Sequence, residues 1–453
     1  MKKTDSATLY TRLRRRAGRN TMKLLRSVVS EQRVHAFCGA VGHEYRKRVF
    51  TPYVTVCGML IQALDQKKSQ SNAVINLMGQ LAASGLPTGS HDASGFCAAR
   101  QRLPEAMLPW LMRQAGTALE HQVPRSVLPW GRPVKLVDGT TVSMPDTPEN
   151  REYFGLPSGQ ADGCGFPLAR VCGLFSLASG AALVAEVDPY RTSEREQWAR
   201  LQQKLNPGDI AVGDRAFGSF ADVVLLRRRG VDGIFRLHQT RPAPGGDWIE
   251  RTVTWHKKKR PAGMSIQEFR ALPRTQKVRL IRANQIDPDT KRRCEIIIVT
   301  TLLDKHRYPA KLIVELYGRR WEVEVDLRHV KSTLKMDILS GEKPQTVTLE
   351  IHAHLLAYNL LRTLMWQAGR RHGINPLRLS LERARQEMLA WHKIHGMHPR
   401  DKSCRDLLRA VASHKIPYRP GRVEPRVVKR RHSKFPYMTQ SRDVLRNQLL
   451  QLA

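Results

Sequence analysis

Residues 134–144 read VKLVDGTTVSM, and this stretch marks where the chain changes its fold class. β-Branched residues dominate it and apolar residues alternate with polar ones, which predicts a half-buried strand. Upstream, residues 49–64 and 71–84 carry apolar residues at steps of three and four, a pattern typical of helices. The period therefore switches from helical to strand-like across the Pro- and Gly-rich segment VPRSVLPWGRP at 123–133.

Downstream of this strand, extended and helical patterns are mixed. We expect further strands at 168–180, 181–190 and 208–217, and helices at 192–205 and 221–230. This order predicts an α/β fold in which helices cover a central sheet.

The chain divides into four regions on the same grounds. Residues 1–125 are expected to form a helical N-terminal domain, and residues 126–232 with 303–370 an α/β domain. Residues 233–302 are again rich in strand patterns, interrupted by RPAPGG and HKKKRPAG, which predicts a β-rich domain inserted into the α/β domain. Residues 371–453 form a helical, basic C-terminal region.

Charge points to the partner. The 76 Lys and Arg residues exceed the 40 Asp and Glu residues, giving a net charge of +36 and a pI near 10.6. Such an excess repels itself unless a polyanion neutralises it, and nucleic acid is the leading candidate ahead of an anionic membrane surface. A basic helix near the N-terminus, with Arg14, Arg15 and Arg16, is either a DNA contact or an ordinary solvated face.

The lack of targeting signals in this sequence and the scatter of its cysteines predict a cytoplasmic protein. With the charge, this predicts an association with the bacterial nucleoid. No apolar run reaches the roughly 20 residues that a membrane span requires, and no apolar core follows the basic N-terminus as in a secretory signal. The seven cysteines are scattered without a CxxC pair, which suits reduced thiols and disfavours a cysteine-based metal site.

Two aspartates follow apolar strands. Asp138 comes after VKLV, and Asp214 comes after DIAVG. Functional groups of open α/β sheets gather at the carboxyl ends of strands, which makes both of them site candidates. Taken alone, each is better explained as an ordinary turn or helix-capping aspartate.

The charged stretch YGRRWEVEVDLRHVK at 317–331 predicts one long helix with an ordered polar face. At about 100° per residue, Tyr317, Arg320, Glu324 and Lys331 share an arc of about 60°. An adjacent stripe can dock on a sheet and consists of Val323, Leu327, Val330 and Leu334. Glu324 is therefore the third candidate carboxylate.

Three carboxylates from two strand ends and a helix suit divalent cations. Mg²⁺ prefers hard oxygen ligands, and a pair of such ions can activate a water or a 3′-hydroxyl for phosphodiester cleavage. The neighbouring Arg and Lys would hold substrate phosphates. A structural, salt-bridged helix remains the alternative from geometry alone.

The spacing Tyr317-x2-Arg320-x3-Glu324-x6-Lys331 resembles the Tyr-Arg-Glu-Lys (YREK) signature of DDE transposases from bacterial insertion sequences, in the insertion sequence four group. Asp138-Gly139-Thr140 and Asp214-Arg215-Ala216-Phe217 are similar to the first two catalytic blocks of that family. The longer gap, between Asp214 and Glu324, is where the family carries an inserted β-rich domain.

The resemblance implies a ribonuclease H-like catalytic domain in which Asp138, Asp214 and Glu324 bind Mg²⁺, with Mn²⁺ able to substitute. It implies cut-and-paste transposition, in which a homodimer cleaves paired transposon ends and transfers strands into target DNA. Relatives pass through a DNA hairpin, whose phosphates the Tyr, Arg and Lys of the signature would contact.

Relatives also stack a flipped base on a tryptophan of the inserted domain, and Trp248 and Trp255 are the candidates here. Two other functions remain open: an inactive DNA-binding relative that inhibits transposition, and a stand-alone Mg²⁺-dependent nuclease. Intact carboxylates disfavour the first, and the nuclease would need neither end recognition nor pairing of ends.

Overall fold

The computed structural model describes residues 29–46, 48–83, 85, 88–157, 163–261, 263–286, 293–395, 401–417 and 438–451. The basic segment with Arg14, Arg15 and Arg16 lies outside these residues, as does most of the basic tail, at 418–437. Their expected contacts with DNA therefore stay predictions.

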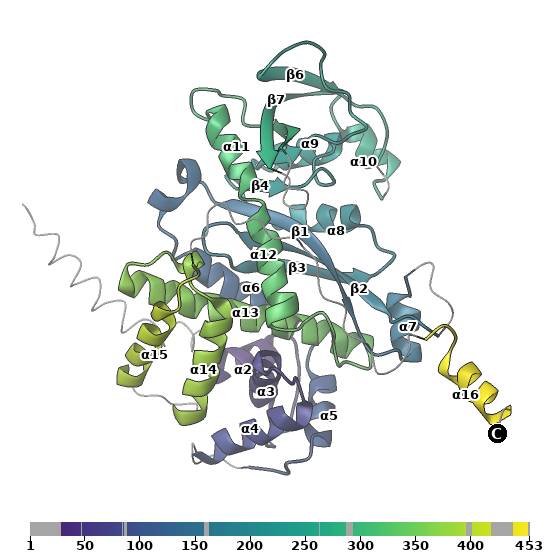
Figure 1. Ribbon diagram of the computed structural model, residues 1–453, viewed down its shortest axis with the longest axis vertical. Helices are drawn as coiled ribbons and strands as arrows, with labels where there is room; N and C mark the ends of the chain where they lie inside the picture. The colour runs from purple at the N-terminus through teal and green to yellow at the C-terminus, as the bar shows by residue number, and fades with distance from the viewer. Residues whose placement is uncertain are drawn as a thin grey trace, which may run out of the picture.

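One eight-stranded mixed sheet runs through the upper half of the molecule (Figure 1). Its spatial order is β3-β2-β1-β4-β5-β8-β7-β6. Strand β1 pairs antiparallel with β2 and parallel with β4, and β4 pairs parallel with β5. The strands are β1 (Val134–Ser143), β2 (Leu168–Ser176), β3 (Ala182–Pro189), β4 (Ile210–Gly213), β5 (Asp232–Arg236), β6 (Glu250–His256), β7 (Thr275–Ile286) and β8 (Arg293–Thr300). The predicted α/β class and the expected strands are confirmed.

The inserted strands extend the central sheet and do not form a sheet of their own. Strand β8 pairs antiparallel with β5, and β7 and β6 continue outward from it. The predicted boundary at 232/233 cuts through β5, so the insertion begins only after Arg236. The apolar sequence of β5 is equally compatible with the first strand of an insertion and with the last strand of the core sheet. The division into four domains otherwise stays a prediction.

Alternating side chains of the central strands supply two separate cores. Leu136, Val212 and Ile234 face a core shared with the N-terminal helices and α13 (Pro344–His372). Val137, Ala211 and Phe235 face the other core, under α8 (Glu194–Gln202) and α9 (Phe220–Arg228). This two-residue alternation decides which face of the sheet each strand-end residue reaches.

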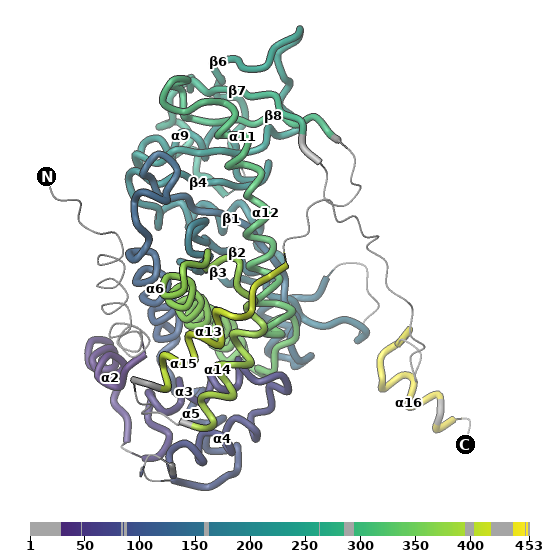
Figure 2. The backbone as a smooth tube through the Cα atoms, turned by 60° about the vertical axis from the view of Figure 1, so that its left-hand side comes forward, coloured from purple at the N-terminus to yellow at the C-terminus, as the bar shows by residue number. Residues whose placement is uncertain are grey.

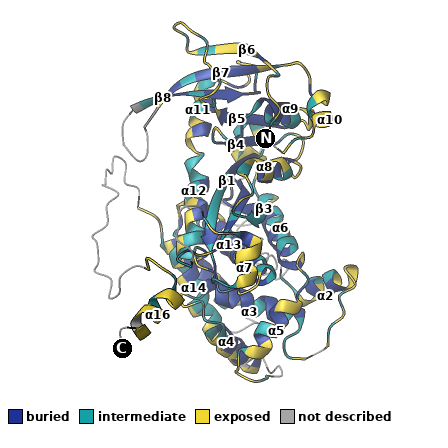
Figure 3. Ribbon diagram, turned by 90° about the vertical axis from the view of Figure 1, so that its right-hand side faces the viewer, coloured by how far each residue is buried: buried dark blue, intermediate teal, exposed yellow. Residues whose placement is uncertain are grey.

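Helices below the sheet surround α13, whose 29 residues are buried over most of their length (Figure 3). The chain enters this layer through α2–α6 and returns to it through α14 and α15, whereas α16 lies apart from the body (Figure 1). The helices not yet given are α2 (Glu31–Ala40), α3 (Pro52–Leu64), α4 (Gln70–Ala83), α5 (Ser94–Arg102), α6 (Met107–Glu120), α7 (Pro148–Phe154), α10 (Ile266–Ala271), α14 (Leu381–His395), α15 (Asp401–Ser413) and α16 (Arg442–Gln451). Short 3₁₀ turns occur at Arg125–Val127, Pro129–Gly131 and Pro376–Arg378. A helical N-terminal region is thus confirmed within the described residues.

The signature stretch is not one regular helix, as we had expected. It comprises the end of α11 (Ala310–Gly318), α12 (Trp321–Arg328) and a π-helical turn, η3 (His329–Thr333). The three pieces follow one another as a column along the sheet (Figures 1 and 2). The predicted docking stripe of Val323, Leu327, Val330 and Leu334 is buried, as expected.

No helix in the described part of the chain is long and apolar enough to cross a membrane. All seven cysteines fall among the described residues, and within that part of the chain none of them forms a disulfide.

Candidate active site

Strand register brings the two predicted aspartates together. Leu136 of β1 pairs with Val212 of β4 in a parallel ladder. Two residues further along each strand, Asp138 and Asp214 continue the same alternation and therefore reach the same face. This is the face that carries α12, so both carboxylates turn toward the signature helix.

Asp138 senses the charge of both other candidate carboxylates. Its pKa is raised to about 7, mainly by burial and in smaller part by the negative charges of Glu324 and Asp214. Its backbone hydrogen bond from Gly139 and the charge of Arg320 oppose the rise. A half-buried carboxyl facing two more carboxyls is a place where a cation is favoured.

Glu324 is held by the arginine of the same signature. The guanidinium Nη1 of Arg320 lies 3.0 Å from Oε1 of Glu324, one helical turn away. Asp214 is held by its own turn, since its Oδ1 accepts a hydrogen bond of 2.7 Å from the backbone N–H of Ala216. Arg320 also lies over the ring of Trp321, with its Cζ 4.7 Å from the ring centroid. The acidic cluster thus has one cation of its own, Arg320.

The donor set fits a hard divalent cation by type. Asp138, Asp214 and Glu324 offer only carboxylate oxygens, and each of the last two raises the pKa of the first. Across the described residues, however, no three Asp, Glu, His or Cys side chains are already placed to hold a metal ion. A bound ion would draw the carboxylates closer than they lie here and would compete with Arg320 for Glu324.

The other two signature residues differ in their exposure. Tyr317 is only 3% exposed and belongs to the core, where burial raises its pKa and its hydroxyl bonds to Arg320. It lies beside Arg320 in the core, and its predicted contact with DNA phosphates stays a prediction. Lys331 is half-buried in the π-helical turn.

Neither tryptophan of the inserted strands presents a bare ring. Trp255 is 5% exposed and Arg241 covers its ring, with Cζ 3.9 Å from the ring centroid. Trp248 is half-buried, its Nε1 donates to the carbonyl of Pro244, and Arg282 lies 4.6 Å from its ring centroid. Trp248 is thus the more exposed of the two, and the contact of either tryptophan with DNA stays a prediction.

A basic cavity of about 640 Å³ was not foreseen from the sequence. Its lining includes Arg215, the residue that follows Asp214 in the chain, together with Phe220 and Ala221 at the start of α9. None of its described lining residues is acidic, and six are basic: Arg195, Arg215, Arg241, Lys258, Lys259 and Arg260. The run HKKKRP at 256–261 was the available signal, but in the sequence it reads as a charged loop.

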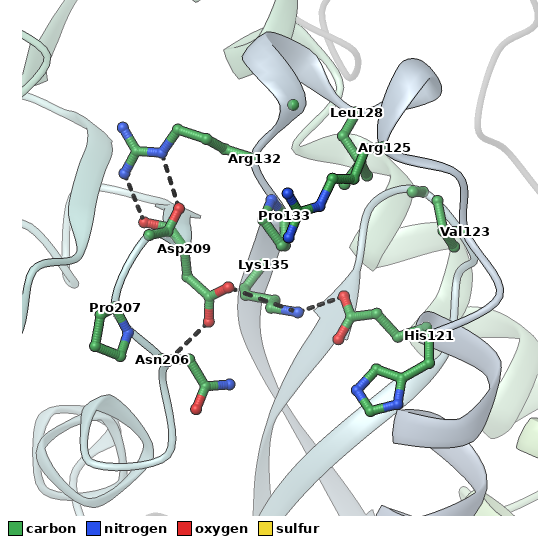
Figure 4. Close-up of a pocket in the computed structure, with 14 residues that line it drawn as sticks. His121, Val123, Arg125, Leu128, Arg132, Pro133, Lys135, Asn206, Pro207 and Asp209 are labelled. Carbon is green, nitrogen blue, oxygen red and sulfur yellow. Dashed lines mark hydrogen bonds and ion pairs between the residues drawn. The ribbon is translucent and has the colours of Figure 1, made fainter.

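A second cavity, of about 560 Å³, lies at the opposite end of β1 and β4 (Figure 4). Lys135 projects into it between Glu120 and Asp209, and Arg132 pairs with Asp232 at 2.7 Å. Arg132 and Lys135 are therefore paired with carboxylates of the core.

The fold and the acidic cluster define a class of protein: a mixed α/β enzyme scaffold that gathers carboxylates at the ends of adjacent parallel strands and surrounds them with positive charge. Comparison with known families makes this specific. The model of the "Transposase DDE domain" matches residues 129–360, more than half of the chain and all of the site described above. The chain belongs to the DDE transposase family and is an enzyme of DNA transposition.

Individual relatives agree. The chain is 27% identical over 312 residues to the transposase InsG of insertion sequence element IS4 from Escherichia coli, covering 66% of this chain and 68% of that protein. It is 26% identical over 360 residues to a probable transposase of element IS5377 from Geobacillus stearothermophilus, covering 78% and 86%. A piggyBac transposase solved as a synaptic complex with hairpin DNA overlaps 89% of this chain and 87% of its own, at 9% identity and a TM-score of 0.41. That overlap is too loose to place DNA on this chain.

Proposed function

We propose that this transposase cleaves DNA at the ends of its own insertion sequence and joins the freed strands to target DNA, in a cut-and-paste reaction that depends on Mg²⁺ or Mn²⁺. The observation that supports the proposal is that Asp138 and Asp214 follow adjacent parallel strands, and that the charges of Asp214 and Glu324 act on the pKa of Asp138. A ribonuclease H-like fold of the catalytic region is part of the proposal. The antiparallel β3-β2-β1 followed by the parallel β4-β5 supports it.

The three carboxylates would hold the metal, which when bound supplies positive charge to the scissile phosphate and lowers the pKa of the attacking water or 3′-hydroxyl. The protein's own contribution is placement. Strands β1 and β4 fix the two aspartates, and α12 brings Glu324 to them from above the sheet. Arg320, released from Glu324, would bind a phosphate of the DNA strand, with Tyr317 supporting it from below.

DNA would contact both the carboxylates and the basic cavity. Arg215 lines the cavity and directly follows Asp214 in the chain, and the cavity's six basic side chains would hold phosphates of the bound strand. The remaining features of the proposal follow from family membership: a homodimer on paired ends, double-stranded DNA as the partner, and action in the bacterial cytoplasm near the nucleoid.

Cleavage assayed on the element's own ends tests this proposal. The full chain is incubated with a duplex carrying a terminal repeat, a target plasmid and Mg²⁺, and the strands are resolved on a denaturing gel. Nicking at the repeat boundary followed by joined products is the expected result. Cleavage without end preference or joining would instead identify a nuclease, and binding without cleavage an inactive relative.

Lys331→Ala should reduce end cleavage more than it reduces affinity for random duplex. Lys331 lies at the edge of the site on the turn after α12, so its charge is available to a phosphate near the scissile bond. Cleavage rates and filter-binding affinities measured on the same preparation check this. An equal loss in both would make Lys331 a general phosphate contact.

Replacing Lys258, Lys259 and Arg260 together by glutamine should weaken DNA binding and flatten its salt dependence. Each phosphate contact contributes a slope of about −0.9 in a plot of log affinity against log salt, so losing three contacts lowers the slope by nearly 3. A triple glutamine variant of the exposed Arg383, Lys393 and Arg405 removes the same charge from α14 and α15 and serves as the control. Equal slopes in the two variants would mean that the cavity binds no phosphate.

A further inference from the structure

The signature helix is anchored from behind by a buried ion pair. On α12, Asp326 lies two residues after Glu324 and therefore projects about 200° around the helix from it. Its carboxylate pairs with the guanidinium of Arg362 on α13, and both side chains are at most 6% exposed. Glu324 thus faces the site while Asp326 faces the core.

Arg362 is itself held by two further side chains, and one of them links it to a third group. Its Nε donates to the hydroxyl of Tyr358 at 2.7 Å, and that hydroxyl donates to the carbonyl of Gly180 at 2.7 Å, in the turn between β2 and β3. Its Nη2 also lies 3.5 Å from Nδ1 of His329, the first residue of the π-helical turn. The guanidinium therefore ties together α12, the start of η3 and the sheet.

The turn at Gly180 is shaped around this guanidinium. Gly180 has a φ of +70°, and a Cβ at this position would lie 3.0 Å from Nε and Cζ of Arg362. Any other residue would meet both the backbone strain and the arginine. The backbone conformation at Gly180 therefore leaves the space that the guanidinium of Arg362 occupies.

Stability alone does not explain such a pair. Buried ion pairs cost so much desolvation that apolar residues of similar volume are often as stabilising, whereas a directional pair fixes one orientation. Orientation matters here: if α12 turned by 20° about its axis, a carboxylate about 5 Å from that axis would move by about 2 Å. A displacement of 1 Å in an active site can cost about a hundredfold in rate.

We propose that Arg362, through Asp326, is a positioning residue that sets the rotation of α12 and so aims Glu324 at Asp138 and Asp214. The expected effect on DNA cleavage rests on the proposed function. The orientation of α12 by Arg362 and Asp326 does not depend on that function. The side of α12 that faces the site carries Arg320 and Glu324. The opposite side carries Asp326, which pairs with Arg362 of α13.

The test uses Arg362→Lys and Asp326→Asn, which keep the approximate size of each side chain but remove the guanidinium or the carboxylate from the pair. Three quantities are measured: Mn²⁺ binding by electron paramagnetic resonance, affinity for the element's ends, and the rate of end cleavage. We expect the Mn²⁺ midpoint to rise severalfold and cleavage to fall about 10- to 100-fold, with DNA affinity changed less than twofold.

Arg385→Lys is the matched control. Arg385 is equally buried and donates to Glu382 and to the carbonyl of Leu64, but it lies on α14 away from α12. Its variant should leave the Mn²⁺ midpoint unchanged. Wild-type Mn²⁺ binding and cleavage in Arg362→Lys and Asp326→Asn would overturn the proposal, and so would an equal loss in Arg385→Lys.

A double variant keeps the proposal testable if the single variants do not fold. Asp326→Leu with Arg362→Met replaces the pair by apolar side chains that can pack without a buried charge. It should fold, as judged by near-ultraviolet circular dichroism, and still bind Mn²⁺ weakly. Wild-type Mn²⁺ binding in the double variant would overturn the proposal, and so would failure of the double variant to fold, because the pair would then serve folding alone.

A wild-type chain that binds Mn²⁺ but cleaves no DNA would contradict the proposed function. The comparison of Mn²⁺ binding between the wild-type chain and the variants would still test the positioning role of Arg362.

Discussion

Asp138→Asn is expected to abolish strand cleavage at the element's ends, by about a thousandfold or more, while DNA binding survives. Asparagine keeps the size and one oxygen but removes the charge that a divalent cation needs, and a thousandfold loss corresponds to about 4 kcal/mol of transition-state stabilisation. Binding survives because phosphates are held by the surrounding cations and not by the carboxylates. Single-turnover cleavage and equilibrium binding on the same repeat duplex measure both quantities.

Asp214→Ala and Glu324→Ala should behave in the same way, since each carboxylate contributes to one cluster. Asp146→Asn is the control, because Asp146 follows the same strand but pairs with Arg151 near the surface. It should cleave at the wild-type rate. Retained nicking in any one of the three site variants would remove that residue from the proposed catalytic set.

Gly116→Val is expected to cost at least about 3–5 kcal/mol of unfolding free energy, enough to leave little folded protein. A Cβ on Gly116 would lie 2.3 Å from the carbonyl oxygen of Ala182, where α6 crosses β3. Asn359 bridges the same crossing: its amide donates to Ala182 O at 2.7 Å and to Met112 O at 3.0 Å. Valine would force the helix away and break these buried hydrogen bonds, so overpacking and lost bonds add together.

Urea unfolding followed by tryptophan fluorescence measures this loss. Gly79→Ala in α4 is the matched control, because a Cβ there meets nothing within 4 Å. It should raise stability by up to about 1 kcal/mol through the better helix propensity of alanine. A wild-type midpoint for Gly116→Val would mean that α6 can move away from β3 freely, contrary to the packing described.

The site was largely predictable because its residues obey local rules. Asp138 and Asp214 end strands whose apolar pattern is strong, and a two-residue alternation then puts them on one face. The docking stripe on α12 followed from the helical period and is buried as expected. Glu324 was the member of this helix assigned to the site, and its proximity to Asp138 agrees with that assignment.

Other features depend on contacts between distant segments and were beyond the sequence. The break between α11 and α12 and the π-helical turn come from packing on the sheet, which shifts residues around the axis, so that Tyr317 enters the core. Strand β5 carries no local mark of which sheet it joins. The basic cavity forms only when Arg195, Arg215 and the loop at 256–261 meet, and Arg362 meets Asp326 from 36 residues away.

Mn²⁺ binding measured by electron paramagnetic resonance tests most directly the claim that Asp138, Asp214 and Glu324 form one metal site. The wild-type chain and the variants Asp138→Asn, Asp214→Asn and Glu324→Gln are compared on the element's end duplex, with Asp146→Asn as the control. Loss of bound Mn²⁺ in each of the three site variants, with wild-type binding in the control, is the predicted result. Mn²⁺ binding that persists unchanged in any of the three would contradict a shared site.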